Sequence, residues 1–166
     1  MSILVLGIGN LIMSDDGVGV RVVQRLQARL RVPPGVTLLD GGTLGLDLLP
    51  RLDGVERLLV VDAVDTGREA GALVRLSGDA IPAVLETKLS PHQMGLKDLL
   101  SVADLQGFAP LEMVLWGVQP SYIGMGMELS PAVEAQFDAL VDNVIRELGR
   151  WGVKTVDISA AEGVSI

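Results

Sequence analysis

Residues 3–10 read ILVLGIGN, a continuous apolar run followed by two glycines and an asparagine. A run of this kind is typical of a strand buried on both faces of a parallel sheet. The residues after it follow a helical pattern, which Pro33-Pro34-Gly35 ends before a second apolar run, Val36–Leu39. This strand-helix-strand unit predicts parallel strands and a right-handed crossover. The predicted helix places four apolar residues on one face: Val22, Val23, Leu26 and Leu30.

The rest of the chain repeats this alternation, which predicts a single-domain α/β fold with a mostly parallel sheet. Ala72–Leu76 follows the preceding strand too closely for a helical crossover, so we expect one antiparallel strand there, at an edge. Residues 1–152 form the predicted domain and residues 153–166 a flexible C-terminal tail. The further expected strands are Arg57–Asp62, Ala72–Leu76 and Leu111–Val118, and the further expected helices are Leu44–Leu52, Pro91–Leu105 and Pro131–Trp151. The last helix shows one apolar stripe: Val133, Phe137, Leu140, Val141, Val144, Leu148 and Trp151.

Composition narrows the classes of partner and of chemistry. Thirteen basic and twenty-one acidic residues give a net charge of −8 without a basic run, which argues against nucleic acid and membrane surfaces as partners. No apolar stretch reaches the roughly 18 residues that a membrane span needs, and we expect a cytoplasmic protein. The chain has no cysteine, so any metal must be held by oxygen and imidazole ligands.

Acidic residues stand where successive strands are expected to end. Asp16 follows the first apolar run, Asp40 closes the second and Asp62 closes the third. The carboxyl ends of parallel strands share one edge of the sheet, where α/β proteins bind ligands. A carboxylate buried like that of Asp62 needs a metal, a proton or a hydrogen-bond partner, unless it only caps the turn at Asp65-Thr66.

The neighbouring acids Asp15 and Asp16 cannot share one task. Adjacent helical residues point about 100° apart, and an acid in the first turn of a helix is favoured in any case. We assign Asp16 to the functional site and Asp15 to the stabilisation of the helix start. The nearby Gly17 and Gly19 indicate that another part of the chain packs closely against this turn.

The only histidine, His92, lies in the segment SPHQ at residues 90–93. Its serine, proline and glutamine match a helix N-cap, a first helical position and a capping box, which would fix the direction of the imidazole. With Asp16 and Asp62, such an imidazole could hold Zn, Ni, Mn or Fe and leave coordination positions for water or substrate.

Three further motifs have two interpretations each. The turn Asp40-Gly41-Gly42-Thr43 is either a substrate-binding element or a plain strand-to-helix turn with Thr43 as N-cap. Residues 122–127, with two methionines and two glycines, could accept a peptide, although ordinary loop packing is favoured. Gly7-Ile8-Gly9 with Asp40 suggests a nicotinamide oxidoreductase. However, Ile12 replaces the third glycine of that fingerprint, and the acids at residues 15–16 would repel a pyrophosphate.

Taken together, the motifs resemble those of the NiFe-hydrogenase maturation endopeptidases, which remove a C-terminal extension from the hydrogenase large-subunit precursor. They occur in the order found in that family and cover nearly the whole chain. The matching segments are residues 3–10, Asp15-Asp16-Gly17-Val18-Gly19, Asp40-Gly41-Gly42-Thr43, Val60-Val61-Asp62-Ala63, Ser90-Pro91-His92-Gln93 and Leu129-Ser130-Pro131.

The resemblance implies a twisted five-stranded sheet with helices on both faces, and an endopeptidase whose catalytic and metal-binding residues are Asp16, Asp62 and His92. It also implies that Asp40, Gly41, Gly42 and Thr43 select the substrate. The metal would be a divalent ion, nickel supplied by the precursor, for which Zn or Cd could substitute in vitro. The water that cleaves the bond would be activated by the metal or by a carboxylate. A nickel-sensing binding module without catalysis is the other alternative.

Overall fold

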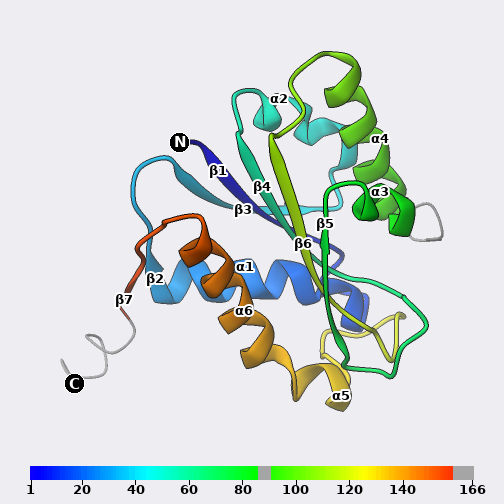
Figure 1. The fold of residues 1–166 in the computed structure, drawn as a ribbon. Coiled ribbons are helices and arrows are strands. Elements are labelled where there is room, and N and C mark those ends of the chain that lie inside the picture. Colours follow the sequence, from blue (N-terminus) through cyan, green and yellow to red (C-terminus); the bar gives the residue numbers. More distant parts are fainter. Residues whose placement is uncertain (86–90, 159–166) are drawn as a thin grey trace.

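A computed structural model describes the backbone of residues 1–85 and 91–158, and the side chains of residues 1–84 and 96–158. Its centre is a twisted five-stranded sheet (Figure 1). Four strands are parallel and the fifth pairs antiparallel at one edge, as predicted. In sheet order the strands are β3 (Val36–Gly42), β1 (Ile3–Ile8), β4 (Arg57–Ala63), β6 (Glu112–Val118) and β5 (Leu73–Ser77).

Helices cover both faces of the sheet, which explains why the central strands are continuously apolar (Figure 1). In β1, Ile3 and Val5 face one helical layer, while Leu4 and Leu6 face the other. The first layer consists of α1 (Val18–Arg29), α5 (Pro131–Glu134) and α6 (Phe137–Arg150). The second consists of α2 (Leu49–Leu52), α3 (Ala80–Leu85) and α4 (Pro91–Leu105). Single 3-10 turns, η1 (Ser14–Gly17) and η2 (Gly45–Leu48), precede α1 and α2.

Some element boundaries differ from the sequence prediction. The helix expected over 131–151 is two helices, because the backbone of Gln136 departs from helical geometry, although every residue of the predicted stripe is buried. Leu30 lies in the short strand β2 (Leu30–Arg31) and not in the helix before it. That strand pairs with β7 (Val156–Asp157), so the segment expected to be a loose tail contains a short strand. None of the helices in the described residues meets the length and hydrophobicity that a membrane crossing requires.

Gly19 lets α1 lie directly on the ends of β1 and β4. A Cβ at this position would collide with the carbonyl oxygen of Val61 and lie 2.7 Å from that of Ile8. Both neighbours are backbone atoms of the central sheet, so neither can move aside cheaply. The close packing that the sequence predicted near Gly19 is therefore confirmed.

Gly19→Ala is expected to destabilise the fold by about 1–3 kcal/mol, the usual cost of overpacking a well-packed site. Gly149 provides the matched control, because a Cβ there meets nothing within 4 Å. Gly149→Ala in α6 should stabilise the protein by up to about 1 kcal/mol through helix propensity. Urea unfolding of both variants measures these changes, and equal free energies of unfolding would contradict the expected clash at Gly19.

Candidate active site

The two candidate carboxylates of the described residues lie buried at the same edge of the sheet. Asp62 is the penultimate residue of β4 and is 0% exposed, and its Oδ1 accepts a hydrogen bond from the Ala63 N–H at 2.8 Å. Asp16 lies in η1, the next element after β1, and is 3% exposed, and its Oδ2 accepts the Asn10 N–H at 3.0 Å. Because β1 and β4 are parallel neighbours and η1 packs against β4, adjacent strands bring both carboxylates to one edge.

The turn after β1 can take this path only because Gly9 has no side chain. Its φ of +129° is in the region that favours glycine, and a Cβ would collide with the carbonyl oxygen of Asp16. The turn therefore folds back onto η1, so that the Asn10 N–H meets the Asp16 carboxylate. The close packing of this turn therefore explains its glycines, and no bound dinucleotide is needed to account for them.

His92 is the second residue of α4, but its side chain and the predicted capping box of residues 90–93 lie outside the described residues. Among the side chains that the structure describes, no group of three or more acidic, histidine or cysteine residues is arranged to hold a metal ion. The three-residue metal site therefore stays a prediction. What the backbone does show is that α4 packs against η2, the turn that follows β3.

The turn at Asp40-Gly41-Gly42-Thr43 contains a β-bulge. Asp40 pairs with Gly7 and Gly42 with Ile8, so Gly41 is an extra residue in β3. A Cβ on Gly41 would lie 2.6 Å from Leu6 Cδ1, which explains the glycine. The exposed Asp40 carboxylate accepts the Gly42 N–H at 3.0 Å and remains accessible to a partner. The proposed N-cap role of Thr43 is wrong, because η2 begins after Leu44 and has no side-chain cap.

Asp15 has a different role from the one that the sequence suggested. It is 0% exposed, and its carboxylate accepts the N–H groups of Ser121 and Tyr122, both at 2.9 Å, and the N–H and hydroxyl of Ser130, both at 2.8 Å. It therefore joins the two ends of the loop after β6, and η1 has no side-chain cap. The assignment of Asp15 to the helix start is wrong because its partners are more than 100 residues away.

Gln119 is a buried polar residue that the sequence analysis missed. Its Oε1 accepts the N–H groups of Thr66 at 2.8 Å and Arg68 at 3.2 Å, and its Nε2 donates to Asp65 Oδ1 at 3.0 Å. The Asp65 carboxylate also accepts the Gly67 N–H, so this turn is capped from within. Gln119 thus holds the loop after β4. The one available signal was a polar residue directly after the apolar strand that ends at Val118.

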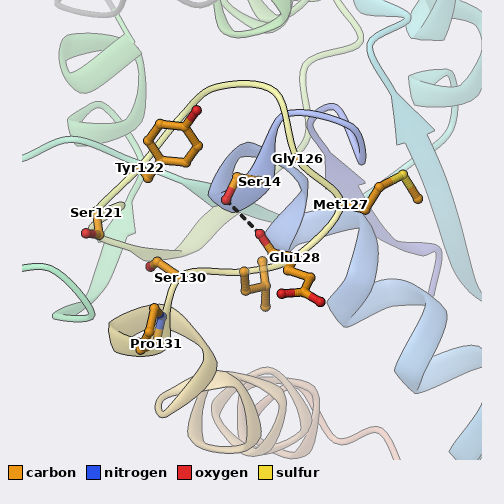
Figure 2. A pocket seen from close by; sticks show the side chains of 9 residues that line it. Ser14, Ser121, Tyr122, Gly126, Met127, Glu128, Ser130 and Pro131 are labelled. Carbon is orange, nitrogen blue, oxygen red and sulfur yellow. Dashed lines mark hydrogen bonds between the residues drawn. The ribbon is translucent and has the colours of Figure 1, made fainter.

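A groove of about 730 Å³ lies beside η1 (Figure 2). The loop after β6 provides most of its lining, and Ser14 contributes from η1. Ser14 has a φ of +53°, donates its N–H to Gly126 and its hydroxyl to the carbonyl oxygen of Glu128 at 2.7 Å. The lining residues are Ser14, Ser121, Tyr122 and residues 126–131.

Comparison with known proteins identifies the family to which this chain belongs. A family model described as hydrogenase maturation protease matches residues 20–147. The chain belongs to this hydrogenase maturation protease family. It is 45% identical over 154 residues to the hydrogenase expression/formation protein HupD of Rhodobacter capsulatus, covering 92% of this chain and 73% of HupD.

Two further relatives agree. The Hydrogenase 2 maturation protease of Escherichia coli (strain K12) is 37% identical, with 94% of this chain and 96% of that protein covered. The solved structure of the hydrogenase maturating endopeptidase HybD from E. coli superposes with a TM-score of 0.92 at 36% identity, covering 96% of this chain and 99% of HybD. As a hydrogenase maturation protease the chain is a peptidase, and the comparisons favour neither the oxidoreductase nor the non-catalytic alternative.

Proposed function

We propose that this peptidase removes the C-terminal extension of a nickel-loaded hydrogenase large-subunit precursor in the cytoplasm. The observation that supports the proposal is the pair of buried carboxylates, Asp16 and Asp62, at the shared edge of the sheet in a chain of this family. A peptidase with no cysteine must use oxygen or imidazole groups, or water that they activate.

The residues at this edge fit a divalent ion carried by the precursor. With the imidazole that His92 is predicted to add, these two carboxylates would form an oxygen and nitrogen donor set that suits nickel or zinc, and we expect Cd or Zn to substitute in vitro. The ion, when bound, supplies Lewis-acid polarisation of a carbonyl group. The N–H groups of Asn10 and Ala63 orient the carboxylates of Asp16 and Asp62, as groups around metal ligands do.

The bulged turn after β3 is the proposed substrate-selecting element. Asp40 is exposed there. Gly41 brings the backbone close to β1, where a Cβ would lie 2.6 Å from Leu6 Cδ1, and Gly42 has a φ of +50°, a conformation that favours glycine. The Gly9 N–H donates to the Gly42 carbonyl oxygen at 2.9 Å. This hydrogen bond joins the turn of residues 40–43, which ends at Thr43, to the turn that leads to Asp16. A peptide recognised at Asp40 would therefore lie along the edge that carries the carboxylates.

Incubation of the purified protein with the nickel-loaded precursor tests the proposal. The mass of the large subunit should fall by the mass of the extension, and His92→Ala should abolish this change. A precursor that binds but keeps its mass would support the nickel-sensing module instead. A precursor that neither binds nor changes mass would contradict the proposed function.

A further inference from the structure

The loop of residues 121–131 exposes large apolar side chains beside the groove. Tyr122, Ile123, Met125 and Met127 are between 47% and 74% exposed. Figure 2 shows Tyr122 and Met127 on the two arms of this loop, with the groove between the loop and η1. Soluble monomers seldom expose apolar side chains so close together, and such patches commonly mark sites of interaction.

The loop is held in one conformation by buried hydrogen bonds. Asp15 binds both of its ends, at Ser121-Tyr122 and at Ser130. Its tip is bound as well, because Gly126 accepts the Ser14 N–H at 2.8 Å and donates to the Ile12 carbonyl oxygen at 2.9 Å. A loop that is already ordered loses little conformational entropy when a ligand binds.

Charge indicates what kind of ligand the groove would take. Among the described residues that line it, Glu128 is the only charged one. The nearby Arg21 donates to the Met127 carbonyl oxygen, so its guanidinium is used in holding the loop. A groove with apolar walls and one carboxylate suits an apolar peptide segment that carries a basic residue.

We propose that the 121–131 loop binds an extended apolar segment of the precursor with a basic residue facing Glu128, and that Asp15 is the positioning residue for this loop. The inference rests on the proposed function. The docking loop and the proposed cleavage site would be linked through the backbone, because Asp15, which holds the loop, directly precedes Asp16. The η1 turn would then hold the docking loop with one carboxylate and present the other at the edge of the sheet.

Met125→Glu tests the docking surface. Met125 is 74% exposed, so the fold should tolerate the change. Burial of a methionine side chain by a bound partner contributes about 1.5–3 kcal/mol to binding. The KM for the precursor should therefore rise about ten- to hundredfold, while kcat changes less than about twofold. The matched control is Leu111→Glu, because Leu111 is 82% exposed just before β6, at the opposite end of that strand, and its KM should not change. Glu128→Lys should raise KM as well.

Asp15→Asn tests the positioning role. It should speed amide hydrogen exchange within residues 121–131 and raise KM more than it lowers kcat. Faster exchange with an unchanged KM would overturn the role of the loop in docking, and so would an unchanged KM for Met125→Glu. Failure of the wild-type protein to process the precursor would instead contradict the proposed function, so the two failures are distinguishable.

Discussion

Asp62→Asn is expected to slow processing of the precursor by orders of magnitude while leaving the fold intact. The asparagine keeps the size of the side chain and the oxygen that accepts the Ala63 N–H, but removes the negative charge. Without that charge the site loses a donor for a divalent ion and a base for a proton, and the cleavage rate should fall by about 10²–10⁴-fold. Because an amide costs less to bury than a carboxylate, the free energy of unfolding should change little. Mass spectrometry of the large subunit and urea unfolding measure the two quantities.

An exposed aspartate provides the control for Asp62→Asn. Asp138 lies on α6 and forms a surface ion pair with Arg25 at 3.2 Å. Because such a pair contributes little, the Asp138→Asn variant should process the precursor at the wild-type rate. Asp16→Asn repeats the test on the other carboxylate if the Asp62 variant does not fold. Wild-type processing by a folded Asp62→Asn variant would show that this carboxylate has no part in cleavage.

Most of the fold could be predicted because its main signals are local. Continuous apolar runs such as Leu58–Val61 mark strands buried on both faces, and the short connection to Leu73–Ser77 indicated an antiparallel edge strand. The missed elements depend on distant or weak signals. The strand β7 exists only through its pairing with β2, more than 120 residues away, and α3 is a six-residue helix with Pro82 in its first turn.

The candidate site could be predicted only in part, for the same reason. Asp16 and Asp62 lie at the same edge of the sheet because the parallel strands before them end there, which the order of apolar runs and acids already implied. The partners of Asp15 and Gln119 could not be read from the sequence, since they lie on loops whose paths are set by tertiary packing. A pair of adjacent acids does predict two different tasks, because neighbouring residues of a turn point in different directions.

Loss of Arg75 should destabilise the fold strongly, because this residue pairs with a carboxylate that is buried away from the site. Glu147 on α6 is 1% exposed and accepts two hydrogen bonds from the Arg75 guanidinium on β5, at 2.7 and 3.1 Å, and one from Trp116 Nε1 at 2.9 Å. Arg75→Met would leave this carboxylate buried without its main partner, at a cost of about 3 kcal/mol at pH 7. By contrast, Arg29→Met removes an exposed pair with Asp157 and should cost at most about 1 kcal/mol.

The contribution of this pair should also depend on pH. The hydrogen bond from Arg75 lowers the pKa of Glu147 below its ordinary value of 4.5, against the opposing effect of burial. A carboxylate whose pKa is lower in the folded state stabilises the fold fully above the unfolded-state pKa, and loses this effect as the pH falls through the folded-state pKa. The difference in free energy of unfolding between the wild type and Arg75→Met should therefore be constant near pH 7 and shrink below pH 4.5. Urea unfolding at a series of pH values measures this difference. If it stays the same below pH 4.5, where Glu147 becomes protonated, then packing of the Arg75 side chain, and not its charge, stabilises the contact between β5 and α6.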